Sequence, residues 1–107
     1  SMPDGHYLLG RQRVTKCLGG VRLADGTLAG STLTMDRALR NLVTTVGLTL
    51  PDAVRRVSTH AAQYLGVADR GVIAIGAFAD LVVCDAQLAV RGFMVEGQVV
   101  HGQVAPA

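Results

Sequence analysis

The sequence is poor in aromatic residues: its 107 residues include no tryptophan, two tyrosines and two phenylalanines, although half of them are hydrophobic. Any core must therefore consist of valine, leucine, isoleucine and alanine, whose small or branched side chains suit contacts between sheets and helices. Charged residues make up only 17% of the chain. A chain this apolar and this weakly charged either covers a large surface with a partner or forms part of a larger protein.

Cysteine is also scarce, because Cys17 and Cys84 are too few and too far apart for a disulfide framework. Neither has a second cysteine or a histidine at the spacing of zinc ligands. No apolar run approaches the roughly 20 residues that span a bilayer, and no charged-then-apolar leader opens the chain. We therefore expect a cytoplasmic protein that binds no membrane.

The formal net charge is only +2, and no aromatic residue interrupts the densest group of basic residues. Basic side chains at alternating strand positions are typical of a solvated sheet face, so no nucleic-acid partner is expected. This group consists of Arg11, Arg13, Lys16 and Arg22.

Turn residues and short apolar runs predict strands near the start of the chain. Residues 14–18 and 21–23 flank Gly19-Gly20, which suits a tight hairpin. Asp25-Gly26 indicates another turn, and the small residues 29–31 are predicted to form a loop that leads into a helix. Such a loop would bring main-chain N–H groups close to a carbonyl, hydroxyl or anionic group of a ligand.

Two neighbouring helices are predicted next. An apolar stripe with helical spacing runs from Met35 to Val46, and Gly47 follows it. A second stripe covers residues 50–65, with Thr49 as N-cap, Pro51 in the first turn and Gly66 as the stop.

From residue 67 the apolar period becomes that of strands. Residues 72–75 and 79–85 are predicted to form a hairpin around Gly76-Ala77, with Leu81–Cys84 buried on both faces. Residues 90–95 and 99–100 predict two more strands, separated by a turn at Glu96-Gly97.

Four segments carry a specific resemblance. They read MPDG at 2–5, DGTLAGSTLTM at 25–35, ALRNLV at 38–43 and GVIAIGAFADLVVCD at 71–85. In this order they resemble the N-acetylglucosamine-6-phosphate deacetylases of the metal-dependent amidohydrolase superfamily. The chain differs at 60–62, where His-Ala-Ala stands in place of the Asn-Pro-Ala common in that family.

The resemblance implies an α/β fold: the C-terminal fragment of a (β/α)8 metal-dependent hydrolase barrel, plus strands of the flanking β-sandwich. Residues 1–66 would belong to the barrel and residues 67–107 to the sandwich. Main-chain groups of Leu28, Ala29 and Gly30 would contact the sugar-phosphate substrate. The family's divalent metal, zinc or a similar ion, and its catalytic aspartate would lie upstream, so the resemblance assigns no catalytic or metal residue to this chain and no metal is expected bound to it.

The expected function is that of a C-terminal segment of an enzyme of amino sugar metabolism, inactive by itself. The full enzyme would hydrolyse the N-acetyl amide to glucosamine 6-phosphate and acetate. Two alternatives stay open: a non-catalytic structural or oligomerisation fragment, and a sugar-phosphate binding module. The expected partner is a second copy of the chain, as a dimer or larger assembly, or the missing N-terminal portion.

The other polar residues have simpler structural interpretations. The three histidines, His6, His60 and His101, fall in different elements and are not expected to converge on a metal. Asp4, Asp25, Asp80 and Asp85 stand at turns or strand ends, where a carboxylate accepts hydrogen bonds from the backbone. Ser31 has no histidine placed to activate it, and is expected to cap a helix start or to contact a ligand.

Overall fold

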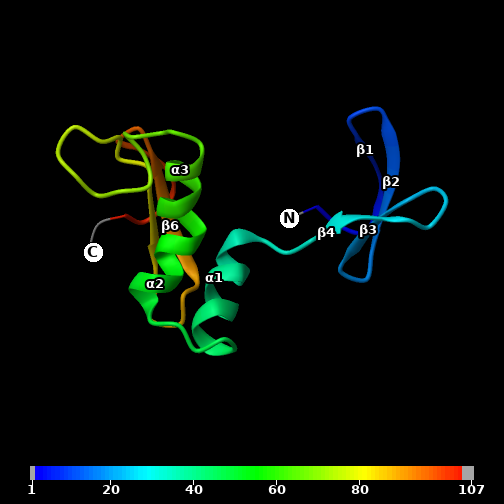
Figure 1. The fold of residues 1–107 in the computed structure, drawn as a ribbon, viewed down its shortest axis with the longest axis horizontal. Helices are drawn as coiled ribbons and strands as arrows, with labels where there is room; N and C mark the ends of the chain where they lie inside the picture. Colours follow the sequence, from blue (N-terminus) through cyan, green and yellow to red (C-terminus); the bar gives the residue numbers. More distant parts are fainter. Residues whose placement is uncertain (1, 105–107) are drawn as a thin grey trace. The chain divides into compact units, whose positions relative to one another are not determined.

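The computed structural model describes residues 2–104, and the chain divides into two compact units, residues 1–34 and 35–107 (Figure 1). The first unit contains strands only, whereas the second combines helices with a small sheet. Sheets and helices together confirm the predicted α/β composition. The predicted division between residues 66 and 67 falls inside the second unit, and the assignment of its two sides to barrel and sandwich stays a prediction.

The first unit is a four-stranded antiparallel meander. Its strands are β1 (Gly5–Leu9), β2 (Gln12–Cys17), β3 (Gly20–Leu23) and β4 (Leu28–Ser31), paired in that order. The predicted hairpin between β2 and β3 is confirmed, but Cys17 pairs with Gly20, so Leu18 and Gly19 form the turn. Both turn residues have left-handed φ angles, 50° and 80°, which a two-residue hairpin turn requires.

The helices of the second unit follow the predicted boundaries closely. α1 (Met35–Thr44) is followed by Gly47, whose φ of 85° is typical of a residue after a helix end. A continuous helical run then comprises α2 (Leu50–Val54), the π-helical turn η1 (Arg55–Thr59) and α3 (His60–Tyr64). Thr49 caps this run, because its side-chain oxygen accepts the Asp52 N–H at 3.4 Å. α1 packs against α2 and η1, as their short connection predicts.

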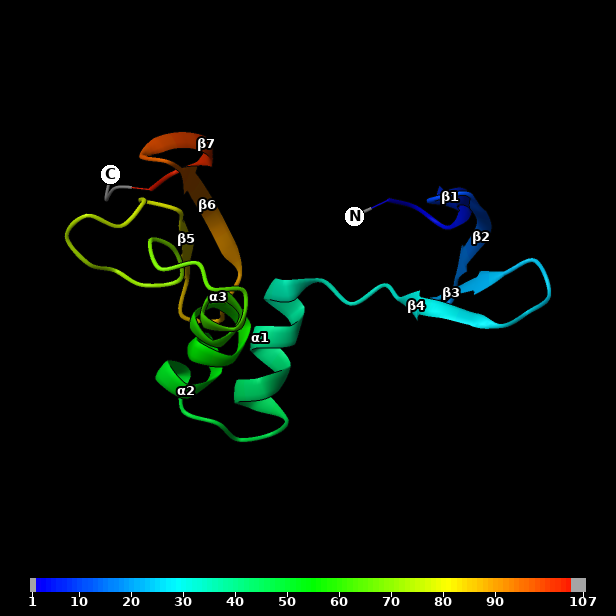
Figure 2. The same ribbon diagram turned by 45° about the horizontal axis from the view of Figure 1, so that its top comes forward.

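A three-stranded antiparallel sheet completes the second unit. It consists of β5 (Leu81–Cys84), β6 (Val90–Val95) and β7 (Gln98–Gly102), and Glu96 and Gly97 form the predicted turn between the last two strands. The α2–α3 run lies beside one face of this sheet (Figures 1 and 2). Val82 on β5 is 64% exposed, so the prediction that Leu81–Cys84 is buried on both faces is wrong.

The predicted strand at residues 72–75 is also wrong. These residues form an irregular loop between α3 and β5, and β5 pairs only with β6. Apolar and β-branched residues favour a strand, but a strand also needs a partner edge for its main-chain groups. Within the described residues, no edge is paired with this segment.

The described residues form very little core. Among them the only buried hydrophobic side chains are those of Val14, in β2, and Ala53, in α2, and Gly92 in β6 is buried as well. A large set of leucine, isoleucine and valine side chains is exposed. The low charge of the sequence is therefore matched by an exposed apolar surface. No helix within residues 2–104 has both the length and the hydropathy to cross a membrane.

Candidate functional site

The predicted substrate-contacting residues lie on the edge strand of the first unit. Leu28, Ala29 and Gly30 belong to β4, which pairs with β3 on one side only. The prediction of a loop at 29–31 is therefore wrong, because β3 offers these residues a partner edge. The outer edge of β4 carries no other strand among residues 2–104, so its outward main-chain groups are available to a ligand.

A β-bulge interrupts β4 at its centre. Arg22 pairs with Leu28 and Val21 pairs with Gly30, which leaves Ala29 as the extra residue. A bulge releases one residue from the ladder and bends the strand, and bulges are frequent beside active sites. Sequence reasoning missed the bulge because its position depends on register rather than on residue type.

A tightly bonded turn leads into β4. The Leu23 N–H donates to the Thr27 carbonyl at 2.8 Å, and the Thr27 N–H donates to Asp25 Oδ1 at 2.9 Å. Hydrogen bonding to the Thr27 side chain, and next to the Thr27 N–H, holds the pKa of Asp25 below its ordinary value. Arg22 Nη1 donates to the Gly26 carbonyl at 3.0 Å, a contact that the sequence did not suggest. The turn role predicted for Asp25 is confirmed.

Gly30 is not required by the packing of its own unit. A methyl group at this position would meet no atom within 4 Å, and its backbone is not left-handed. Leu28, by contrast, exposes 63% of its surface. None of the three residues carries an acid, a base or a nucleophile, so what they can contribute chemically is binding through the main chain and apolar contact.

Ser31 has a local role at the end of β4. Its Oγ accepts the Leu33 N–H at 3.0 Å, which forms a small turn ahead of α1. α1 begins at Met35, so Ser31 is not its cap. The Ser31 hydroxyl therefore accepts a main-chain hydrogen bond within this turn. No nucleophilic role was predicted for Ser31.

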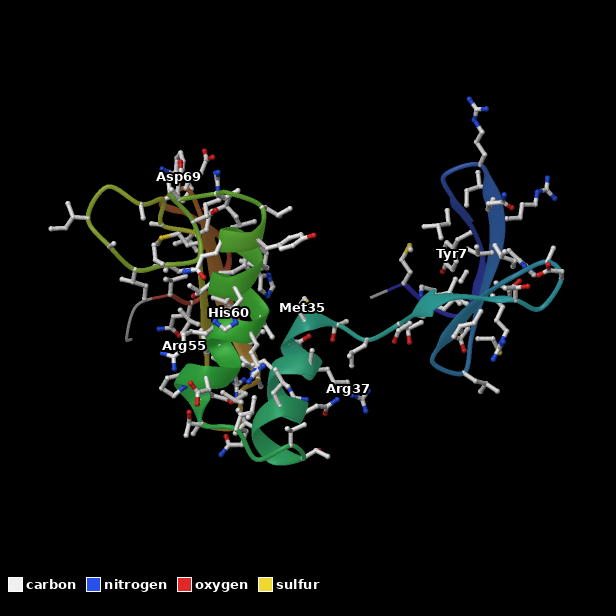
Figure 3. The ribbon with its side chains drawn as sticks, viewed as in Figure 1. Tyr7, Met35, Arg37, Arg55, His60 and Asp69 are labelled. Carbon is white, nitrogen blue, oxygen red and sulfur yellow. The ribbon has the colours of Figure 1, made fainter. Side chains whose placement is uncertain are left out.

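The histidines occupy separate elements. His6 on β1 is hydrogen bonded to Thr15 Oγ1 at 3.1 Å, and the ring of His101 on β7 stacks on Phe93 with centroids 5.8 Å apart. His60 projects from α3 and is exposed (Figure 3). Throughout residues 2–104 no group of three or more metal-ligating side chains converges.

Two aspartates of the second unit have the backbone-bonding roles predicted for them. Asp80 Oδ1 accepts the Glu96 N–H at 2.7 Å, and Asp85 Oδ1 accepts the N–H groups of Gln87 and Ala89, both at 2.9 Å. The pKa of each is lowered, chiefly by the Glu96 N–H for Asp80 and the Ala89 N–H for Asp85. These carboxylates therefore stabilise turns, and their lowered pKa values suit a permanently charged hydrogen-bond acceptor.

Comparison with known proteins identifies the family. The amidohydrolase family profile matches residues 10–105, which is most of the chain, so the chain belongs to the amidohydrolase family. The resemblance recognised in the four sequence segments is thereby confirmed.

Its relatives are sugar-phosphate deacetylases. The N-acetylgalactosamine-6-phosphate deacetylase of Escherichia coli O157:H7 is 42% identical over 98 residues, which cover 91% of this chain and 26% of the relative. The crystal structure of N-acetylglucosamine-6-phosphate deacetylase from Thermotoga maritima is similar with a TM-score of 0.80 and 39% identity, over 95% of this chain and 28% of that one.

A third relative was solved with a substrate. It is an aspartate-to-alanine mutant of the Mycobacterium smegmatis N-acetyl-D-glucosamine-6-phosphate deacetylase in complex with N-acetyl-D-glucosamine-6-phosphate. The similarity has a TM-score of 0.76 at 39% identity and covers 92% of this chain and 27% of that protein. The chain thus spans about a quarter of these relatives, and 59% of a further relative from Escherichia coli K12.

Proposed function

We propose that this chain supplies the C-terminal portion of an N-acetylglucosamine-6-phosphate deacetylase, an enzyme of amino sugar metabolism. The complete enzyme would hydrolyse the N-acetyl amide of its substrate to give glucosamine 6-phosphate and acetate. The observation that carries the proposal is the 39% identity to two solved deacetylases across more than nine-tenths of the chain. The DGTLAGSTLTM segment, which includes β4, supports it.

In this proposal β4 binds the sugar and takes no part in the chemical step. Main-chain groups of Leu28, Ala29 and Gly30 at the open edge of the sheet would contact the substrate, with the bulge at Ala29 turning them toward it. Nothing inside the unit requires a glycine at position 30. In this proposal Gly30 is needed for the ligand, because a side chain there would fill the space through which the ligand approaches.

The described residues do not fit the family's divalent metal. They bring no three metal-ligating side chains together, and the two aspartates that flank β5, Asp80 and Asp85, are already engaged by backbone N–H groups and arginines. The metal ligands and the general base would therefore belong to the remaining part of the enzyme, and the isolated chain is expected to be inactive.

The same proposal assigns the chain a place in the larger fold. Residues 1–66 would close a (β/α)8 barrel, and residues 67–107 would add strands to its flanking β-sandwich. The whole protein would act in the cytoplasm, with either a second copy or the missing N-terminal portion as partner. A purely structural or oligomerisation segment is the second candidate, favoured by the scarcity of buried side chains. A free-standing sugar-phosphate binding module depends on β4 alone.

A segment exchange tests the proposal. Residues 2–104 replace the matching segment of the Thermotoga maritima deacetylase, and acetate release from N-acetylglucosamine 6-phosphate is measured with zinc and with a chelator. We expect metal-dependent turnover by the chimera and none by the isolated chain. A folded chimera that releases no acetate would refute the enzymatic proposal and leave the structural one.

Two glycines of the same sheet provide matched variants in the chimera. Gly30→Ala should raise KM at least about tenfold, because its methyl group enters the space left for the substrate. Gly20→Ala should leave KM unchanged, because Gly20 also lacks a left-handed φ and a methyl group there meets only ordinary contacts at 3.8 and 3.9 Å. Equal effects of the two substitutions would contradict a substrate role for Gly30.

A further inference from the structure

The antiparallel sheet of the first unit gathers polar and basic side chains on one side. Directly opposed residues of neighbouring strands point to the same side of a sheet, and successive residues along a strand alternate. The register pairs His6 with Thr15 and Thr15 with Arg22, so these three form a row across β1, β2 and β3. Arg13, two residues before Thr15 on β2, shares that side. We call His6, Arg13, Thr15 and Arg22 the basic face.

No acidic side chain balances the basic face. The strands β1 to β4 contain no aspartate or glutamate, and the ion pairs among residues 2–104 all lie in the second unit. With four basic and two acidic residues, the first unit accounts for the whole formal net charge of +2. Arg13 and Arg22 are diagonal neighbours on paired strands, a separation of about 7–8 Å. Their positive charges repel each other, and an anion held between them would relieve this repulsion.

A cleft of about 700 Å³ adjoins the basic face. Its lining includes His6, Arg13 and Thr15 together with the apolar side chain of Leu8. This volume lies within the range of small-molecule sites, which combine apolar walls with a few polar groups. The basic face therefore borders a space that a small ligand fits.

The local hydrogen bonds orient the polar groups and leave donors over. His6 Nδ1 is hydrogen bonded to Thr15 Oγ1 at 3.1 Å, which holds the imidazole across β2. Arg22 Nη1 donates to the Gly26 carbonyl at 3.0 Å, so the guanidinium is held while its other N–H groups find no acceptor within residues 2–104. Arg13 is exposed and donates to none of these residues. Guanidinium groups with N–H donors to spare bind phosphate oxygens in pairs.

We propose that the basic face binds the dianion of a phosphate monoester, a role that goes beyond the sugar contacts proposed for β4. Arg13 and Arg22 supply the charge and paired N–H groups, and Thr15 and His6 add hydrogen bonds. A small phosphate fits better than a nucleic acid. Tyr7, the only tyrosine, phenylalanine or tryptophan of the unit, is opposed to Val14 and so points to the other side of the sheet, away from any base bound on the basic face.

Titration of the full chain with inorganic phosphate at constant ionic strength tests the proposal. We expect saturable NMR shifts at His6, Thr15 and the arginine side chains of the basic face. Arg13→Gln should weaken phosphate binding about fivefold, because an exposed ion pair is lost. Lys16→Gln is the matched control: it removes the same charge from the same strand, but Lys16 lies on the opposite side of the sheet and donates to the Met2 carbonyl. It should leave the dissociation constant unchanged.

Three results would each overturn the proposal. They are the absence of saturable shifts, equal weakening of phosphate binding by Arg13→Gln and Lys16→Gln, and shifts centred outside the basic face. Both variants alter side chains in β2, so circular dichroism checks that each keeps its fold.

Two sources carry this chemical group: the 6-phosphate of the proposed deacetylase substrate and a separate phosphate compound. In the chimera, a rise in KM with Arg13→Gln for N-acetylglucosamine 6-phosphate but not for N-acetylglucosamine would identify the substrate's own phosphate. An unchanged KM beside weaker phosphate binding would identify a separate phosphate, and either result supports the site. The titration needs no turnover, so failure of the phosphate site and failure of the proposed deacetylase function are observed separately.

Discussion

Gly92→Ala should be among the most destabilising methyl additions in this protein. Gly92 lies in β6, opposite Gly102 of β7. A methyl group on Gly92 would stand 2.7 Å from the Gln103 carbonyl oxygen and 2.8 Å from the His101 carbonyl oxygen. These are main-chain atoms of the neighbouring strand and the residue after it, so they cannot move aside as a flexible side chain could.

The cost is steric, because Gly92 does not have the left-handed backbone that disfavours alanine. Overpacking a tight site typically costs about 1–3 kcal/mol, and backbone neighbours place Gly92→Ala at the upper end. A loss of about 3 kcal/mol shifts the unfolding equilibrium roughly 100-fold.

Gly47→Ala is the matched control. Gly47 has a left-handed φ of 85°, and an added methyl group would enter open space, so only backbone strain of about 1–2 kcal/mol applies. Urea unfolding followed by circular dichroism measures both variants, and amide exchange over residues 90–102 locates the damage. A Gly92→Ala loss no greater than that of Gly47→Ala would refute the steric argument.

Two further predictions concern the Thr49 helix cap and the stability of the protein at low pH. Thr49→Ala should cost about 1 kcal/mol in urea unfolding, because the Asp52 N–H loses its acceptor, whereas Thr49→Ser should retain most of the stability. Asp80 and Asp85 have folded pKa values below the ordinary 3.8, so their stabilising effect is complete above that value and is lost as the pH falls below it through the folded pKa. A urea midpoint that stays constant between about pH 5 and pH 2 would contradict this acid dependence, and the Asp80→Asn/Asp85→Asn variant should show less of it.

The local elements were predictable wherever a short-range signal was strong. The stripe from Met35 and the Thr49 cap predicted both helical runs, because helix hydrogen bonds join residues only four apart. Glu96-Gly97 likewise predicted the β6–β7 hairpin, because a two-residue turn pairs residues that are close in sequence.

Sequence reasoning failed where a segment's conformation depends on what lies beside it. Residues 29–31 have the composition of a loop but belong to β4, which pairs with β3. Residues 72–75 have the composition of a strand but no edge to pair with among the described residues. Arg70 gave no signal at all, since its carboxylate partners are 10 and 26 residues away. The residues of the candidate site, Leu28, Ala29 and Gly30, were found only through the family resemblance.

The sequence by itself determined the family, the helices and the turns, since these depend on residue identity and on neighbours a few positions away. Only the tertiary structure decided that β4 is a bulged edge strand and that residues 72–75 form a loop without a strand partner among residues 2–104. The physical reason is that strand pairing and ion pairs join residues distant in sequence, so their partners exist only after the chain has folded.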